Sequence, residues 1–246
     1  MKKVLDLFLN TISFLTIIPI KSKKLEHYGY LLYIFFPAVG LIIGLLCIGI
    51  LKLLEEFLNS KELVVFFLLF FYIVLADFFH LDGFADTIDA LYGFILNKEP
   101  KKILKDPHIG AMAVVYLVMI LLYKFFILKH IKNLETAILI SSVISRWSMS
   151  VAGFYGVAME DSFVGKSFIY RDLKVLIFSL VSAFFLCFIF FANSIFLLFM
   201  FFCSYLITFL VVKFFNHKFS GINGDIIGFC SEVVEILILL MFFIGD

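Results

Sequence analysis

Three regularly spaced aspartates stand out in an otherwise apolar stretch of the chain. Residues 80–90 are HLDGFADTIDA, in which Asp82, Asp86 and Asp89 are spaced i, i+4 and i+7. On a helix these positions share one face, where three carboxylates repel one another unless a cation lies between them. Oxygen ligands suit Mg²⁺, which also binds substrate phosphates. The spacing therefore predicts a magnesium site formed by these three aspartates.

Two other interpretations of this cluster stay open. Asp82 could cap a helix while Asp86 and Asp89 face water, although a solvated acidic face normally carries charged partners four residues away, and this one has none. The acids could instead form a proton or cation transport site, because an ionisable residue inside a membrane is a functional candidate by default. Asp77, which lies near the end of an apolar run one turn earlier, is a candidate on the same ground.

A second polar segment, KDPHIGAM at residues 105–112, follows the first in the same connection between apolar runs. The lysines that precede it fit the ordinary basic flank of a membrane span. Asp106 could cap the next helix or join the metal site. We expect Asp106 and His108 to bind substrate.

Arg146 lies in the middle of an apolar run, with no acid beside it. An arginine in hydrocarbon must find a partner or a polar cavity, and its guanidinium is a bidentate ligand for phosphate. Its expected partners are the aspartates of the first cluster or a substrate phosphate. The alternative is a buried ion pair with a purely structural role.

Two further polar segments contain glycine: EDSFVGKSF at residues 160–168 and SGINGDIIG at residues 220–228. Glycines ahead of a helix let backbone N–H groups approach an anion, although a plain junction between loop and helix has the same pattern. Asp225 and Glu232 are seven residues apart and share a helix face, and Glu232 lies inside an apolar run, which favours a functional role. The predicted substrate-binding residues here are Lys166, Gly221, Gly224, Asp225 and Glu232.

The elements that position these clusters must lie in a membrane. The 246 residues are 63% hydrophobic and have a mean hydropathy of +1.12, whereas soluble domains are roughly 45–50% apolar. The net charge of +1 gives no electrostatic argument for binding nucleic acid. Four cysteines lie in apolar runs without a CxxC pair, which indicates small buried side chains and no disulfide framework or zinc site.

Runs of about 20 apolar residues predict the membrane spans. The segment 4–20 is shorter and more polar, which indicates a retained interfacial or re-entrant helix. Most lysines and arginines outside the spans fall on one side if the N-terminus is cytoplasmic. That side then carries loops 80–108, 154–173 and 213–225, where most of the polar clusters lie. The fold is predicted to be all-α, a polytopic bundle and one domain over residues 1–246, with about seven spans at 30–52, 63–79, 109–128, 134–153, 174–191, 195–212 and 226–244.

The ordered set of motifs resembles the cobalamin synthase family of adenosylcobinamide-GDP ribazoletransferases. HLDGFADTIDALYG is similar to that family's HLDGLADTxDG signature, and KDPHIGAM, SRW, EDSFVGKSF and SGINGDIIGFCSE resemble its later elements in the same order. FLTIIPI and FPAVGLIIG, nearer the start, also match. This chain departs from the family pattern at Ala90 and Ser220, which replace glycines, at 107–108, where Pro-His replaces Ser-Arg, and at 162–163, where Ser-Phe replaces Gly-Leu.

The resemblance implies a Mg²⁺-dependent enzyme of the cytoplasmic membrane that assembles the nucleotide loop of vitamin B12. It would join adenosylcobinamide-GDP to α-ribazole, or to α-ribazole 5′-phosphate, and release GMP. Asp82 and Asp86, with Asp89, would hold the metal; one aspartate or His80 would accept the proton; Arg146 or Lys166 would stabilise charge on GMP. The implied partners are these substrates and the lipid bilayer, without nucleic acid. A homo-oligomer, or contact with other enzymes of the pathway, stays open.

Two rival functions share some of these features. A CDP-alcohol-type membrane phosphotransferase also uses clustered aspartates, but its pattern has an arginine after the alanine, where this chain has Asp86 after Ala85. A cation or proton transporter explains acids and Arg146 inside spans, but transporters carry polar residues deep in several helices with access from both sides.

Overall fold

The chain is a bundle of helices. The computed structural model describes residues 2–20, 29–97, 103–104, 108–159 and 167–245, and this part contains no strand. Within these residues, six helices are long and apolar enough to cross a membrane, and a bent pair of helices adds a seventh crossing if it counts as one. This confirms the predicted all-α multi-pass fold. The six are α2 (Phe36–Phe57), α6 (Ala111–His130), α7 (Leu134–Tyr155), α9 (Leu173–Phe190), α10 (Ser194–Lys218) and α11 (Gly224–Gly245).

The bent pair differs most from the sequence-based expectation. Helix α3 (Lys61–Tyr72) continues through a π-helical segment, η2 (Ile73–Asp77), into α4 (Phe78–Ile95), with a bend of 86°. The prediction of a loop over 80–108 is therefore wrong for residues 80–95. The helix continues because this segment is amphipathic: the side opposite the aspartates buries Leu81, Phe84 and Ile88.

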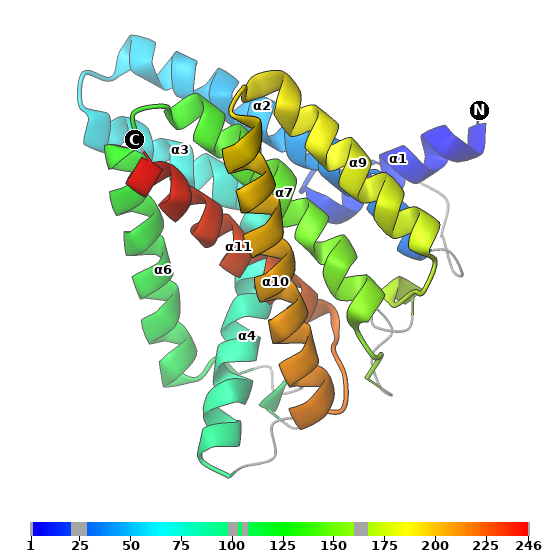
Figure 1. Ribbon diagram of the computed structural model, residues 1–246. Helices are drawn as coiled ribbons and strands as arrows, with labels where there is room; N and C mark the ends of the chain where they lie inside the picture. Colours follow the sequence, from blue (N-terminus) through cyan, green and yellow to red (C-terminus); the bar gives the residue numbers. More distant parts are fainter. Residues whose placement is uncertain (1, 21–28, 98–102, 105–107, 160–166, 246) are drawn as a thin grey trace.

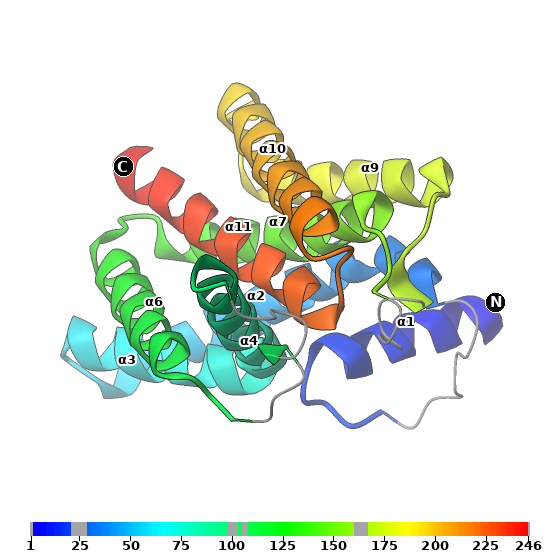
Figure 2. The ribbon, with the colours of Figure 1, turned by 90° about the horizontal axis from the view of Figure 1, so that it is seen from below.

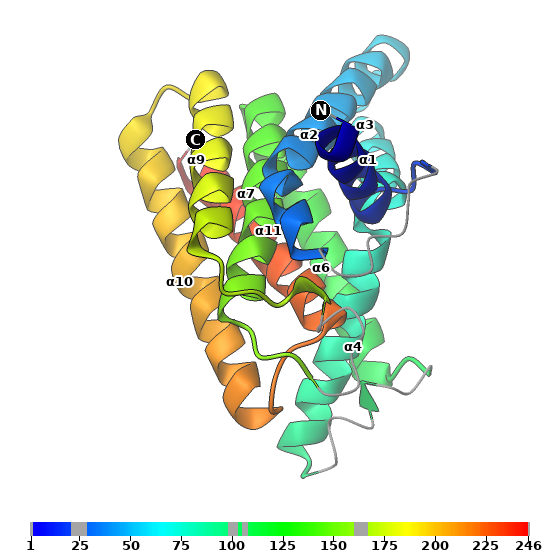
Figure 3. The ribbon, with the colours of Figure 1, turned by 90° about the vertical axis from the view of Figure 1, so that its right-hand side faces the viewer.

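The N-terminal helix α1 (Lys2–Leu15) is 14 residues long, or about 21 Å, which is too short to cross a bilayer. It lies along the side of the bundle near α2 (Figure 3). After α1, the amide of Ile17 donates to the carbonyl oxygen of Leu75 in η2 at 3.0 Å. Backbone outside regular helix is tolerated at membrane depth where other parts of the protein satisfy it, and here the N-terminal segment does so. A short 3-10 helix, η1 (Gly29–Ile34), leads into α2.

Helix α7 forms the centre of the bundle. In its 18-residue apolar window 94% of residues are buried, compared with 22% for α9. It packs against α2, α9, α10 and α11, which surround it in the view from below (Figure 2). Small polar residues face its neighbours, including Ser142, Ser145 and Ser148, and small residues allow close packing of helices where lipid removes any hydrophobic driving force.

Among the described residues, the polar positions on α4, at the start of α6 and at the start of α11 lie towards one end of the bundle, which is the lower end in Figure 1. There α4 lies beside the start of α6, the end of α10 and the start of α11. The opposite end carries the tight connection between α9 and α10 and the connection between α6 and α7. That the polar loops share one face of the membrane stays a prediction, because parts of loops 80–108 and 154–173 lie outside the described residues.

Candidate active site

The site begins with a close approach between α4 and α11. A β-carbon placed on Gly83 would lie 2.7 Å from the Cα and 2.8 Å from the carbonyl oxygen of Asp225. One turn away, a β-carbon on Gly228 would lie 3.3 Å from the Cα of His80. The glycine within the aspartate motif thus brings the backbone of α4 against the first turn of α11.

This contact gathers carboxylates from two helices. Asp82 is exposed, and Asp86 and Asp225 are each partly buried. Asp86 lies within electrostatic reach of Asp225, Asp82 and Asp89, and Asp225 lies within reach of Asp82. Like charges that share a partly buried site repel one another strongly, so this cluster favours a cation. The sequence predicted the α4 face, but it did not predict that Asp225 would join it.

The donor set at this crossing consists of carboxylate oxygens, which fits Mg²⁺. Among the described residues, no group of three or more His, Cys, Asp and Glu side chains could by itself hold a metal ion, so a site made by Asp82, Asp86 and Asp89 together is not formed there. Mg²⁺ usually takes only one or two carboxylates and completes its shell with waters and substrate phosphates. The residues present therefore fit a magnesium site that the substrate completes.

Asp89 has a different role from the other two aspartates of its face. Its Oδ2 accepts the amide of Gly110 at 2.5 Å and its Oδ1 accepts the amide of Ala113 at 3.0 Å. These amides lie at the start of α6, where backbone N–H groups have no partner within the helix. A β-carbon on Gly110 would lie 2.5 Å from Oδ1, so only glycine leaves room for the carboxylate. Asp89 caps α6 from α4, and both of its oxygens are engaged.

The glycine turn before α11 lies against the end of α7. Ser220 and Gly221 have positive φ angles of 60° and 140°, and the amide of Ile222 donates to the carbonyl oxygen of Val157 at 2.7 Å. Asn223 then caps α11: its Oδ1 accepts the amide of Ile226 at 3.1 Å, and its Nδ2 donates to Asp225 at 2.5 Å. This turn therefore fixes the orientation of Asp225.

Two side chains that the sequence did not single out hold this junction. Asn216 accepts the amide of Val157 and donates to the carbonyl oxygen of Tyr155, both at 2.9 Å. Arg171 donates to the carbonyl oxygens of Gly156 and Tyr170, both at 2.6 Å, and to that of Phe154. These bonds satisfy carbonyl groups at the C-terminal end of α7. The Gly221 turn therefore contacts a backbone segment that these hydrogen bonds hold in place.

The remaining predicted residues fall in different places. His108 is exposed just before α6, and His80 is buried on α4. Gly224 is the first residue of α11. Asp106 and Lys166 lie outside the described residues, so their predicted substrate contacts stay predictions.

Arg146 lies in the buried interior of the bundle. It is completely buried, and its Nη1 donates to Glu235 at 2.9 Å, to the hydroxyl of Tyr72 at 3.0 Å and to Ser145 at 2.9 Å. The sequence predicted an aspartate of α4 or a substrate phosphate as its partner. The contact with Glu235 favours the alternative of a structural ion pair.

Glu232 has a buried partner as well. The Nζ of Lys124 lies 2.8 Å from Glu232 and 2.6 Å from Glu235, and both acids and the lysine are almost fully buried. We call Lys124, Arg146, Glu232 and Glu235 the charge quartet; its two cations and two anions balance. Lys124 and Glu235 were not predicted as site residues, although their position as ionisable residues inside apolar spans is the signal that could have identified them.

The family of the chain follows from comparison with known proteins. Residues 7–243 match the family model described as Cobalamin-5-phosphate synthase. The chain belongs to this family. The match favours the synthase interpretation over the CDP-alcohol phosphotransferase and the transporter. Members of the cobalamin-5-phosphate synthase family are enzymes, and the carboxylates at the crossing of α4 and α11 are the candidate active site of this one.

Individual relatives match nearly the whole chain. The adenosylcobinamide-GDP ribazoletransferase of Thermodesulfovibrio yellowstonii is 32% identical and covers 99% of this chain and 98% of its own length. The same enzyme of Caldanaerobacter subterraneus is 32% identical, with 92% of each chain covered, and that of Clostridium botulinum is 30% identical, with 98% of each covered. No solved structure matches the chain.

Proposed function

We propose that this chain is an adenosylcobinamide-GDP ribazoletransferase that assembles the nucleotide loop of cobalamin. A hydroxyl oxygen of α-ribazole, or of its 5′-phosphate, attacks the phosphorus that carries cobinamide. The P–O bond to GMP breaks, and GMP leaves. The family match and the relatives' names support the reaction, and the convergence of Asp82, Asp86 and Asp225 at one crossing is the structural observation that carries the site.

The reaction requires positioning and charge neutralisation more than covalent chemistry by the protein. Asp86 and Asp225 would supply the carboxylate ligands of Mg²⁺ at the crossing, and water and substrate phosphates would complete its shell. Bound Mg²⁺ would neutralise charge on the diphosphate and on the departing phosphate. Asp82 is the most exposed of the three, so it is placed to accept the proton of the attacking hydroxyl. Buried His80 is the alternative base.

The other residues of the site act on position. Asn223 and the Gly221 turn set the direction of Asp225, and Asp89 fixes the start of α6 against α4. We leave Arg146 out of the catalytic set because its guanidinium already has a buried carboxylate partner. The same end of the bundle would face the cytoplasm, because the sequence assigns most lysines and arginines outside the spans to the cytoplasmic side when the N-terminus is inside.

Turnover by the purified protein tests the proposal. Adenosylcobinamide-GDP and α-ribazole are supplied with Mg²⁺ to the protein in detergent, and GMP release is followed for the wild type, Asp82→Asn and Asp6→Asn. Asp6 lies on α1, which packs against η1 and α2, so Asp6→Asn is the matched control. We expect release that requires Mg²⁺, stops with EDTA, is lost in Asp82→Asn and persists in the control. A folded wild type that releases no GMP under these conditions contradicts the proposed reaction.

A further inference from the structure

Through Tyr72, the charge quartet connects the same two segments that supply the site carboxylates. The hydroxyl group of Tyr72, at the end of α3, donates a hydrogen bond to Glu235 of α11. Tyr72 lies ten residues before Asp82, and Glu235 lies ten residues after Asp225. The segment from α3 to α4 runs antiparallel to α11, and the two are therefore in contact at two places. Gly83 meets Asp225 beside the site, and Tyr72 meets Glu235 deeper in the bundle.

Glu235 receives donors from three different helices. Tyr72 of α3 and Arg146 of α7 approach its Oε2, while Lys124 of α6 approaches its Oε1. The cationic groups of Lys124 and Arg146 each lie 5.7 Å from the centre of the Tyr72 ring. A sliding movement of α11 along its axis would separate Glu235 from all three donors at once. The quartet thus opposes any change in the axial position of α11.

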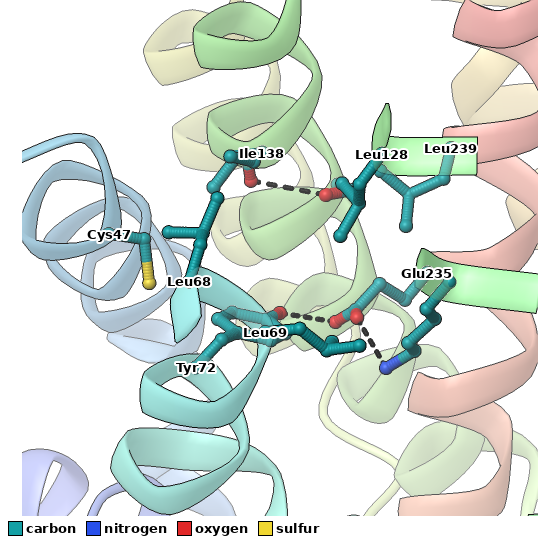
Figure 4. A pocket seen from close by; sticks show the side chains of 10 residues that line it. Cys47, Leu68, Leu69, Tyr72, Leu128, Ile138, Glu235 and Leu239 are labelled. Atoms are coloured by element: carbon teal, nitrogen blue, oxygen red, sulfur yellow. Dashed lines mark hydrogen bonds and ion pairs between the residues drawn. The ribbon is translucent and has the colours of Figure 1, made fainter. Parts of the chain in front are cut away.

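Apolar packing alone cannot set this position as firmly. Inside a bilayer, lipid tails are as apolar as leucine, so helix association depends on close packing and on polar contacts between helices. The best-attested role of buried polar or ionic groups is to fix the register of helices. The quartet is also a poor binding site, because the cavity beside it has a volume of only about 20 Å³, and Figure 4 shows Tyr72 and Glu235 bridged across it among Leu68, Leu69 and Leu239.

We infer that Glu235 is a positioning residue: with Tyr72, Lys124 and Arg146 it fixes the register of α11 against α3 and α4, and so sets the position of Asp225 relative to Asp82 and Asp86. This inference rests on the proposed function for the identity of the metal site. It assigns Lys124 and Glu235 a role in the site without contact with substrate.

Two conservative substitutions test the role of the quartet. Tyr72→Phe removes only the hydroxyl and keeps the ring near Lys124 and Arg146. Glu235→Gln keeps the volume of the side chain and removes its charge. Tyr205→Phe is the matched control, because the hydroxyl of Tyr205 bonds that of Tyr155 at 2.7 Å between α10 and α7, outside the quartet. Each variant is compared with the wild type in detergent, after its thermal unfolding shows that it is folded.

The first measurement is the Mg²⁺ concentration that gives half-maximal GMP release. Loss of residues that position metal ligands commonly reduces metal affinity or activity about 10-fold or more, so we expect that concentration to rise about tenfold in Glu235→Gln and by less in Tyr72→Phe. A purely structural role would lower the fraction of folded protein and leave this concentration unchanged. Tyr205→Phe should behave as the wild type does.

The second measurement does not need activity. Spin labels are placed on cysteines introduced at Ile95 of α4 and Ile244 of α11, which are 67% and 74% exposed. The background is Cys203→Ser, because Cys203 is partly exposed whereas the other three native cysteines are buried. We expect a displaced or broader distance distribution in Tyr72→Phe and Glu235→Gln than in the wild type and Tyr205→Phe. If Glu235→Gln does not fold, Tyr72→Phe alone decides. Folded Tyr72→Phe and Glu235→Gln proteins with an unchanged distance distribution overturn the inference. If the wild type shows no turnover, the proposed function is contradicted instead. The spin-label distances still test whether these residues fix the register of α11.

Discussion

The backbone of Gly83 on α4 lies directly against the backbone of Asp225 on α11. A β-carbon at Gly83 would approach the Cα and carbonyl oxygen of Asp225 to 2.7 and 2.8 Å. Backbone atoms inside two packed helices cannot move aside as a flexible side chain can. The separation of the two helices that carry the site carboxylates therefore depends on the absence of a side chain at one position.

Gly83→Ala should damage both stability and activity. Overpacking of this kind typically costs about 1–3 kcal/mol, and separation of α4 from α11 would also move Asp225 away from Asp82. We expect a lower unfolding temperature in detergent and at least about a tenfold loss of GMP release, since small displacements in an active site have large effects on rate. Gly49→Ala is the control, because a β-carbon there meets nothing within 4 Å. Equal behaviour of the two variants would contradict the close approach.

Asp86→Asn and Asp89→Ala should separate metal binding from capping. Asp86→Asn relieves repulsion within the carboxylate cluster, so the metal-free protein should keep its stability or gain some, while Mg²⁺ no longer raises its unfolding temperature and GMP release is lost. Asp89→Ala removes the cap of α6 and should cost about 1 kcal/mol of stability, with part of the activity retained. Thermal unfolding of each variant, measured with and without Mg²⁺, checks both expectations. A folded Asp89→Ala protein that has lost the thermal response to Mg²⁺ would show that Asp89 is a ligand.

Lys124→Met alone should lower the stability of the protein far more than it does when it is combined with Glu232→Gln. The single substitution leaves Glu232 and a less neutralised Glu235 buried, and removal of one partner from a buried ion pair costs about 3–5 kcal/mol. Combining it with Glu232→Gln restores the balance with one cation and one anion, Arg146 and Glu235. We expect the double variant to unfold at a clearly higher temperature than Lys124→Met. If the stability losses of the single variants Lys124→Met and Glu232→Gln simply add in the double variant, the coupling of these charges is contradicted.

Asn216→Asp should weaken the junction that supports the Gly221 turn. The aspartate keeps an acceptor for the amide of Val157 but faces the carbonyl oxygen of Tyr155 with a second acceptor, which costs about 1–3 kcal/mol. We expect a lower unfolding temperature and a higher KM. Asn193→Asp is the control: Asn193 caps α10 at the opposite end of the bundle, and aspartate is an equally good cap. An Asn216→Asp protein as stable as the control would contradict this assignment.

The sequence by itself determined the membrane fold and most of the spans. Long apolar runs must be helices in lipid, because every backbone polar group needs an internal partner there, and the runs at 134–153 and 174–191 correspond closely to α7 and α9. It also determined the face formed by Asp82, Asp86 and Asp89, since that face follows from helix periodicity alone. The order of its motifs was enough to indicate the family.

Only the tertiary structure decided which charged groups meet. Asp89 and Asp86 share a face and a residue type, yet one caps α6 and the other lies in the carboxylate cluster with Asp225, because the packing partner differs along α4. Arg146 and Glu235 are 89 residues apart in sequence. Periodicity describes one helix at a time, whereas the partner of a buried charge depends on how several helices cross, and that information lies in no single segment of the chain.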